Sequence, residues 1–338
     1  MSAPLPQPIV SARDLRILFP TRDGLETVKA VDGVAFDVAQ GETFGIIGES
    51  GSGKTTIGRA LVSLIAPSDG TILHGGTDLR TLSRSRFREW RRAYQIIFQD
   101  PNAALNPRRR ILDSVTEPLE VAGSGDTASR RRIALEMLAH VGLSDETAAR
   151  FPHQLSGGQK QRVNIARVLT LRPKLIVCDE SVAALDVSIR GDILNLFADL
   201  QREFGLTYVF ITHDISVVSH ISDRVAVTYL GKFMELGRTE DVIDHPLHPY
   251  TQALLSAEPK PVPSALRDDR RIILSGEIPS PISPPSGCRF RTRCPAAQAL
   301  CAEHEPDWRE LTQGHHVACH FATLQGPPAP NKTAQGET

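Results

Sequence analysis

The chain has 338 residues, a length typical of two domains or of one large domain with an appendage. Hydrophobic residues make up 41% of the chain and charged residues 23%, which excludes disorder as a description of the whole chain. Its 38 basic residues balance 39 acidic ones, so we expect no nucleic acid as a partner.

The chain has no apolar run near the roughly 20 residues that a membrane-spanning helix needs. Its Pro-rich start lacks the basic segment of a secretory signal, so we expect a cytosolic protein. The five cysteines are then metal ligands or free thiols, because a reducing compartment disfavours disulfides.

Alternation of apolar and polar residues over the first forty positions predicts an N-terminal antiparallel β subdomain. An apolar strand over Thr43–Ile47 then enters a glycine-rich turn. Beyond the turn, Ile57, Leu61 and Leu64 predict a helix that ends before Pro67.

Further apolar strands are expected at 94–98, 175–178, 208–211 and 225–229, with helical segments between them. Apolar strands that alternate with helices indicate a parallel sheet covered on both faces. A helical insertion, at about 100–170, interrupts this α/β pattern.

These patterns predict a first domain with an α/β core over 1–258, with a different composition beyond it. We expect a Pro-rich linker and a Cys-rich C-terminal extension over 259–325, and a disordered tail over 326–338.

The glycine-rich turn fits the phosphate-binding pattern G-x-x-x-x-G-K-[ST], between a strand and a helix as that pattern requires. Its backbone N–H groups and the positive end of the helix dipole are suited to phosphate oxygens. We expect Lys54 to reach the β and γ phosphates and Thr55 to bind Mg²⁺. The candidate nucleotide-binding residues here are Gly48, Glu49, Ser50, Gly51, Ser52, Gly53, Lys54, Thr55 and Thr56.

An apolar strand that ends in Asp179 and Glu180 supplies the second element. At the strand end, Asp179 is placed to hold Mg²⁺ through water. Glu180 is placed to polarise the water that attacks the γ-phosphate.

The pentapeptide 155–159 begins another helix with a hydroxyl and two glycines, which is a second anion-binding arrangement. Its candidate binding residues are Ser156, Gly157, Gly158 and Gln159. Two phosphate-binding faces on one chain suggest a head-to-tail dimer that closes on ATP from both sides.

With these motifs, residues 9–255 resemble the ATP-binding cassette (ABC) ATPase family. The resemblance implies a P-loop NTPase core and an ABC ATPase domain over 1–258. The resemblance implies that Gln99 contacts Mg²⁺ and the attacking water, and that His213 contacts the γ-phosphate. It also implies that Asp186 lies at the dimer seam and that Phe19 stacks on adenine. At 181–184 the family's usual sequence is replaced, but no catalytic group is lost, so we expect ATP hydrolysis to survive.

The segments 98–108, 248–251 and 284–295 further resemble the ATPases of oligopeptide and dipeptide importers, and are closer to their F-type subunit. That resemblance implies a second, related ATPase subunit, two transmembrane permease subunits and an extracytoplasmic substrate-binding protein. It also implies a peripheral position on the cytoplasmic face of the cell membrane. Related importers carry nickel, glutathione or other small solutes, and a soluble ABC ATPase remains a less favoured alternative.

The four C-terminal cysteines are Cys288, Cys294, Cys301 and Cys319. Four thiolates suit tetrahedral Zn²⁺ or a [4Fe–4S] cluster, although the spacings match neither usual pattern, and free thiols stay open. The resemblance favours the cluster, because peptide-importer ATPases carry such an arm. The groups of arginines at 84–92, 108–110 and 130–132 are expected to form a solvated face or to contact a partner subunit.

Overall fold

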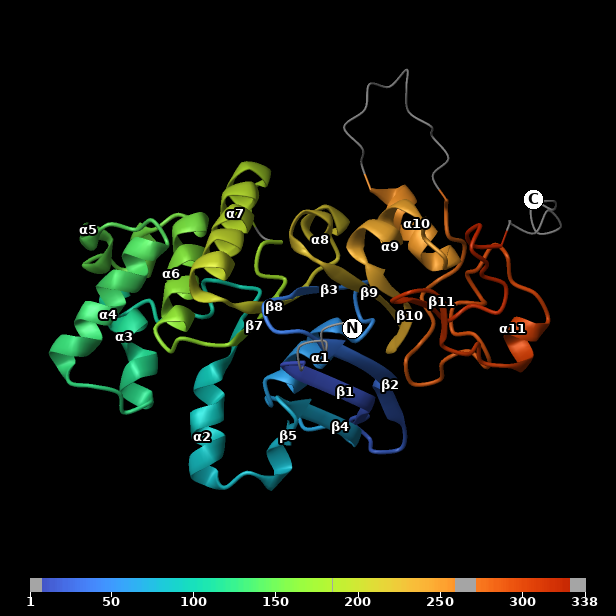
Figure 1. The fold of residues 1–338 in the computed structure, drawn as a ribbon, viewed down its shortest axis with the longest axis horizontal. Helices are drawn as coiled ribbons and strands as arrows, with labels where there is room; N and C mark the ends of the chain where they lie inside the picture. Colours follow the sequence, from blue (N-terminus) through green and yellow to red (C-terminus); the bar gives the residue numbers. More distant parts are fainter. Residues whose placement is uncertain (1–7, 184, 259–271, 329–338) are drawn as a thin grey trace, which may run out of the picture.

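The computed structural model describes residues 8–183, 185–258 and 272–328. The first part of the predicted linker, 259–271, lies outside these residues, as does the predicted tail apart from 326–328. Two β-sheets organise the described chain (Figure 1).

The larger sheet has eight strands in the order β11-β12-β10-β9-β3-β8-β7-β6. Its central strands are β3 (Thr43–Ile47), β6 (Tyr94–Ile97), β7 (Leu175–Asp179), β8 (Thr207–Ile211) and β9 (Arg224–Tyr229). These five strands run parallel to one another, as the apolar runs predicted.

The other edge of this sheet is antiparallel, so the predicted parallel sheet is incomplete. It contains β10 (Lys232–Arg238), β11 (Arg309–Thr312) and β12 (His315–Val317). Leu230 and Gly231, both at positive φ, turn the chain from β9 directly into β10. Two residues suffice only for a hairpin, which makes that strand pair antiparallel.

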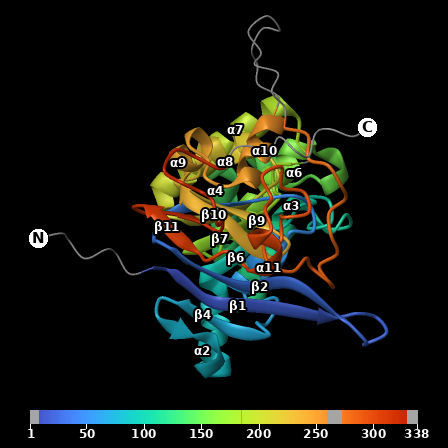
Figure 2. The same cartoon turned by 90° about the vertical axis from the view of Figure 1, so that its right-hand side faces the viewer.

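The smaller sheet is antiparallel throughout, which confirms the predicted N-terminal β subdomain. Its order is β2-β1-β4-β5. The strands are β1 (Val10–Pro20), β2 (Thr27–Val38), β4 (Asp69–His74) and β5 (Thr77–Asp78). This sheet lies below the larger one in both Figure 1 and Figure 2.

Helices cover both faces of the larger sheet. Those above it in Figures 1 and 2 are α7 (Val187–Phe204), α8 (Ile215–Ile221), α9 (Thr239–Asp244) and α10 (Pro249–Ala257). On the other face lies α1 (Lys54–Leu61), which ends three residues before the predicted Leu64. Ser63 adopts a left-handed φ of 55°, a conformation that a helix cannot continue through.

The predicted helical insertion is present. It consists of α3 (Ile111–Val121), α4 (Thr127–His140), α5 (Asp145–Ala148), the 3-10 turn η2 (Pro152–Gln154) and α6 (Gly157–Leu169). The turn η1 (Leu79–Thr81) and helix α2 (Arg84–Ala93) connect the smaller sheet to β6, and α11 (Leu300–Glu303) lies in the C-terminal extension.

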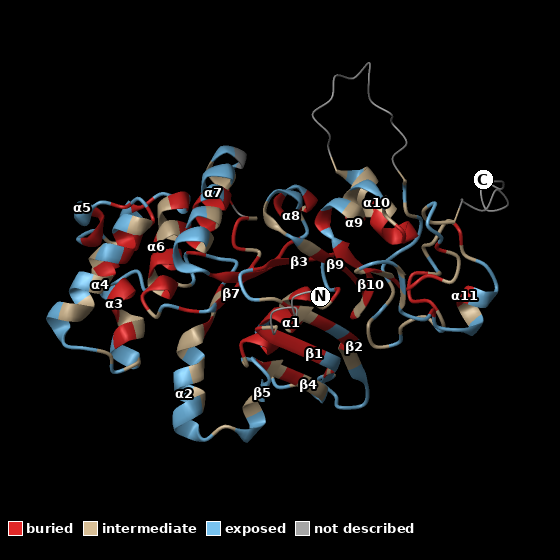
Figure 3. Cartoon of the chain, viewed as in Figure 1, coloured by how far each residue is buried: buried red, intermediate tan, exposed pale blue. Residues whose placement is uncertain are grey.

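Buried residues follow the larger sheet and the helix faces turned toward it, whereas α2 and the loop tips are largely exposed (Figure 3). The C-terminal extension shares this core, because β12 pairs with β10 and Phe290 is fully buried. Within the described residues, no helix is both long and apolar enough to cross a membrane.

Candidate nucleotide site

The glycine-rich loop joins β3 to α1. A side chain at Gly48 would place its Cβ 2.2 Å from the carbonyl oxygen of Thr228, and one at Gly53 would meet the carbonyl oxygen of Ala30 at the same distance. Both glycines also have positive φ, 150° and 99°. The loop can therefore close tightly around a ligand only with glycine at these positions.

Lys54 is buried within this loop and is 5% exposed. Its ammonium group donates hydrogen bonds to the carbonyl oxygens of Gly48 and Glu49, each at 2.8 Å. Burial lowers the pKa of Lys54, and the carboxylates of Glu180, Asp179 and Glu49 oppose that shift. The buried ammonium group would therefore attract an anionic ligand more strongly than an ammonium group exposed to water.

Thr55 and Asp179 lie together although 124 positions separate them in the chain: the Thr55 hydroxyl donates to the Asp179 carboxylate at 2.8 Å. Asp179 ends β7 and is 4% exposed, and burial raises its pKa. A hydroxyl and a carboxylate oxygen side by side are the ligand types that Mg²⁺ uses beside phosphates.

Glu180 connects the two remaining predicted catalytic residues. Its carboxylate accepts a hydrogen bond from the Gln99 amide at 2.6 Å and lies 3.3 Å from Nδ1 of His213. Glu180 has a left-handed φ of 48°, the kind of backbone outlier that recurs at functional sites. The structure therefore brings the three predicted catalytic residues together at the ends of β6, β7 and β8.

A cavity of about 290 Å³ adjoins this cluster. It is lined by Val28, Ala30, residues 50–56, Gln99, Glu180 and Pro281. Phe19 is 38% exposed and lies opposite Val28 in the β1–β2 pair. Directly opposed residues project to the same face of a sheet, so Phe19 lies beside the cavity wall.

The second predicted phosphate-binding face lies elsewhere. Ser156 caps α6, since its hydroxyl accepts from the N–H of Gln159 and its own N–H donates to the Gln159 side chain. A Cβ on Gly157 would contact the side chain of Leu185 at 3.8 Å, which places Asp186 nearby. Within one chain, this helix tip and Asp186 do not line the glycine-loop cavity.

Sequence reasoning missed two contacts of the glycine loop. The Tyr250 hydroxyl accepts a hydrogen bond from the N–H of Glu49 at 2.9 Å, and the Arg293 guanidinium bonds the Glu49 carboxylate. Neither residue belongs to a local pattern that points to the loop, so no signal in the sequence identified them. Residue 184 of the altered loop lies outside the described residues.

The four C-terminal cysteines are free thiols, three buried and Cys294 partly exposed. Burial raises the pKa of Cys288 to about 12 and of Cys294 to about 11, and the cysteines act electrostatically on one another. Among the described residues, however, no three Cys, His, Asp or Glu side chains are grouped as a metal ion requires. The predicted zinc or iron–sulfur site is therefore not supported.

A glycine loop between strand and helix, with acidic residues at the end of a nearby parallel strand, defines a P-loop nucleotide-binding protein. The family model described as ABC transporter matches residues 31–183. A second model, described as the C-terminal region of oligopeptide/dipeptide transporters, matches residues 234–301.

Curated relatives extend the similarity over nearly the whole chain. The oligopeptide transport ATP-binding protein AppF of Bacillus subtilis is 49% identical, over 95% of this chain and 99% of its own. A putative peptide import ATP-binding protein of Brucella ovis is 51% identical, over 92% and 97%. The chain belongs to the ABC transporter family, and the predicted resemblance to peptide-importer ATPases is confirmed.

Solved structures agree with the fold. The ATP-binding cassette MJ0796, in a dimeric post-hydrolysis state bound to ADP and Pi, is 31% identical with a TM-score of 0.61, covering 68% of this chain and 98% of its own. CbiO1 of Clostridium perfringens, part of an ABC transporter complex, is 29% identical with a TM-score of 0.63, covering 70% and 91%. The described chain thus contains an ABC ATPase cassette.

Proposed function

We propose that this chain is the ATP-binding and ATP-hydrolysing subunit of an ABC importer for di- or oligopeptides. The observation that carries the proposal is one cavity lined by Lys54, Thr55, Gln99 and Glu180, with Asp179 hydrogen-bonded to Thr55 beside it. The peptide cargo is inferred from the names of the relatives.

In the proposed mechanism, Lys54 and the loop N–H groups bind the phosphates. Thr55 with Asp179 would hold Mg²⁺, which would supply charge neutralisation at the phosphate oxygens. Glu180 takes the proton of the attacking water, because its carboxylate lines the cavity beside the phosphate-binding loop. Gln99 fixes the orientation of that carboxylate.

The second phosphate-binding face of this chain contacts the nucleotide that is bound in the partner subunit. Ser156 and Gly157 are exposed and Gln159 is half-buried. None of them lines its own chain's cavity, so they are available to a nucleotide held by a second ATPase subunit. Asp186 is exposed beside them, at the proposed dimer seam. Closure of two subunits on ATP would then move the membrane subunits.

We place the contact with a permease subunit at a cavity of about 640 Å³ between β6 and the helical insertion. Three exposed apolar side chains line it, Leu64, Phe98 and Val121, together with arginines from α2. Phe98 directly precedes Gln99, and the Gln99 amide donates a hydrogen bond to Glu180, the proposed base. A segment docked against Phe98 would therefore be connected to Glu180 through Gln99. This position corresponds to attachment at the cytoplasmic face of the membrane.

We further propose that Cys288, Cys294, Cys301 and Cys319 together hold a [4Fe–4S] cluster. Four thiolates are the usual ligands of such a cluster, and a four-iron cluster spreads its ligands more widely than a single ion does. The support for the proposal is the set of four cysteines within one extension, since the described side chains are not grouped as a single metal ion requires. Bound, the cluster would supply a structural crosslink in the extension, and no step of hydrolysis depends on it.

The test is to purify the chain with its membrane subunits and binding protein, and to measure ATP hydrolysis with and without peptides. We expect hydrolysis that rises when a transported peptide is added with the binding protein. A complex that hydrolyses ATP but responds to nickel or glutathione instead would refute the peptide assignment. A complex that binds no ATP would refute the whole proposal.

A further inference from the structure

The C-terminal extension reaches the glycine loop directly. The Arg293 guanidinium donates two hydrogen bonds to the Glu49 carboxylate, at 2.6 and 3.0 Å, across 244 positions of sequence. The Arg293 side chain is 8% exposed and that of Glu49 24% exposed. A paired, largely buried arginine–carboxylate contact of this kind is stronger and more directional than a surface ion pair.

Glu49 is held at three points. Its N–H donates to the Tyr250 hydroxyl at 2.9 Å, its carbonyl oxygen accepts from Lys54 at 2.8 Å, and its carboxylate binds Arg293. The negative charge of Glu49 also raises the pKa of Lys54 against the effect of burial. The field of this carboxylate therefore extends to the ammonium group that is placed to bind phosphate.

The extension meets the same cavity at a second point. The carbonyl oxygen of Pro281 accepts a hydrogen bond from the N–H of Lys29 at 3.1 Å, which lays the segment along β2. Pro281 lines the nucleotide cavity together with Val28 of β2. The wall of the cavity on this side is thus shared by the cassette and the extension.

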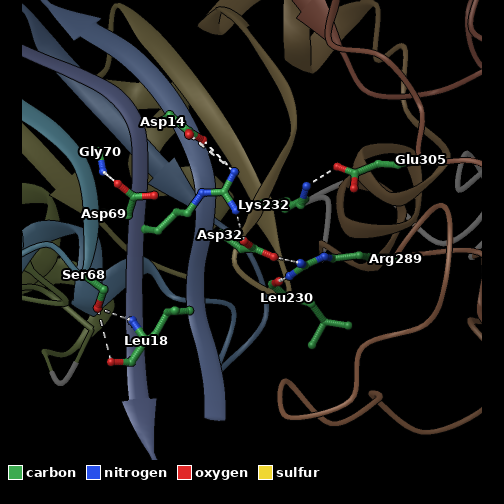
Figure 4. Close-up of polar contacts among 11 residues, drawn as sticks. Asp14, Leu18, Asp32, Ser68, Asp69, Gly70, Leu230, Lys232, Arg289 and Glu305 are labelled. Atoms are coloured by element: carbon green, nitrogen blue, oxygen red, sulfur yellow. Dashed lines mark hydrogen bonds and ion pairs between the residues drawn. The ribbon is translucent and has the colours of Figure 1, made fainter.

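Neighbouring residues of the extension hold the contacts of Arg293 and Pro281 in place. Figure 4 shows Arg289 of the extension bonded to Asp32 on β2 and to the carbonyl oxygen of Leu230. Phe290 is fully buried, with its ring 5.3 Å from that of Tyr229 and 5.2 Å from that of Tyr250. Arg293 is therefore presented to the loop by a rigid, packed segment.

We propose that the C-terminal extension is a working part of the nucleotide site, with Arg293 as a positioning residue that acts through Glu49. A triphosphate brings several negative charges to a loop that already contains the Glu49 carboxylate. Arg293 neutralises that carboxylate and holds it away from the phosphates, so that ATP affinity depends on a residue of the extension. This inference rests on the proposed function, since it requires ATP as the ligand.

The experiment uses the full chain in its assembled transporter. Arg293→Met should weaken ATP affinity about tenfold, seen as a raised KM for ATP with kcat nearly unchanged, because an unpaired carboxylate then faces the phosphates. The matched control is Arg291→Met. Arg291 lies two positions away, and among the described residues its side chain donates hydrogen bonds only to Ser286. The KM of this variant should therefore equal the parent's.

Two further measurements separate electrostatic positioning from simple loss of structure. The double change Glu49→Gln with Arg293→Met should recover most of the lost affinity, because it removes the carboxylate that needs neutralising. The KM difference between Arg293→Met and the parent should also shrink at about 1 M salt, where the screening length falls to about 3 Å. If Arg293→Met weakened ATP binding only through lost packing, neither the second substitution nor high salt would restore the affinity.

If Arg293→Met fails to fold, Arg293→Lys replaces it. Lysine keeps the charge but loses the paired hydrogen-bond geometry, so its KM should rise by clearly less than tenfold. A folded Arg293→Met chain with the parent's KM, a double variant as weak as the single one, or a Lys variant tenfold weaker would each overturn the inference. A parent transporter that does not bind ATP would instead refute the proposed function.

Discussion

His74 makes the stability of the small β-sheet dependent on pH. It ends β4 and is 4% exposed, with its Nε2 bonded to the carbonyl oxygen of Leu61 at 2.7 Å. Its ring packs edge-on against Trp90 and Tyr94, at 4.7 and 4.8 Å between ring centroids. Nδ1 is buried with no hydrogen-bond partner, so protonation would place an unpaired N–H inside the protein.

Burial accordingly lowers the pKa of His74 from 6.5 to about 4. Above pH 6.5 the imidazole is neutral in the folded and the unfolded chain, and pH has no effect through it. Between pH 6.5 and 4 the unfolded chain binds the proton and the folded chain does not, so stability falls as pH falls. From these two pKa values, the loss is about 2 kcal/mol at pH 5 and about 3 kcal/mol at pH 4.

The assay is denaturant unfolding at pH 7 and pH 5, followed by tryptophan fluorescence, to which Trp90 beside the histidine contributes. Two variants remove the titrating group in different ways: His74→Phe keeps the ring packing, and His74→Gln keeps a donor for Leu61. They will differ in stability at pH 7, but each should lose about 2 kcal/mol less than the parent between the two pH values. Variants that lose as much as the parent would refute the reasoning.

Three further predictions follow from individual side chains. Glu180→Gln should bind ATP and accumulate as an ATP-bound dimer, with hydrolysis lowered about 10²–10⁴-fold, measured by phosphate release; the parent's rate would exclude Glu180 as the base. Glu235 is fully buried, and its two carboxylate oxygens accept hydrogen bonds from the N–H groups of Leu247 and His248. In Glu235→Gln the side-chain NH₂ group would face one of these backbone N–H groups, and neither can accept a hydrogen bond. The free energy of unfolding should fall by about 1–3 kcal/mol, and an unchanged denaturation midpoint would contradict this contact. Cys294→Ser should lower the iron content of anaerobically purified protein, and a parent chain without iron or sulfide would refute the cluster.

The nucleotide site was largely predictable because its chemistry resides in contiguous residues. A loop that presents successive N–H groups to phosphate must be one short segment, so its glycines and Lys54 stand together in the sequence. The proximity of Thr55 and Asp179 could also be predicted from the sequence. Asp179 ends one apolar strand, and Thr55 lies in the first turn of the helix that follows another. The carboxyl ends of parallel strands meet at one edge of the sheet.

The antiparallel edge of the large sheet was not predictable in the same way. Strand β12 has only three residues, His315–Val317, too few to show a period of two. It also lies in a segment whose cysteines and prolines indicated a separate extension. Pairing with β10 is settled by burial of Val317 and by the contact of His315 with the buried Glu235, neither of which leaves a mark on local sequence.

The contact between Arg293 and Glu49 shows what local patterns omit in a functional site. In the sequence, Glu49 is an unconstrained position of the phosphate-binding pattern, and Arg293 is one arginine of a basic, cysteine-containing segment. Neither residue has a preferred partner until the fold brings the extension across β2, where Arg289 and Phe290 fix its position. A carboxylate within a phosphate-binding loop would repel the phosphates in a cassette alone. In a cassette whose extension supplies a neutralising arginine, that repulsion is reduced. The loop and the extension are therefore best regarded as one unit, and a change in either should be felt at the nucleotide.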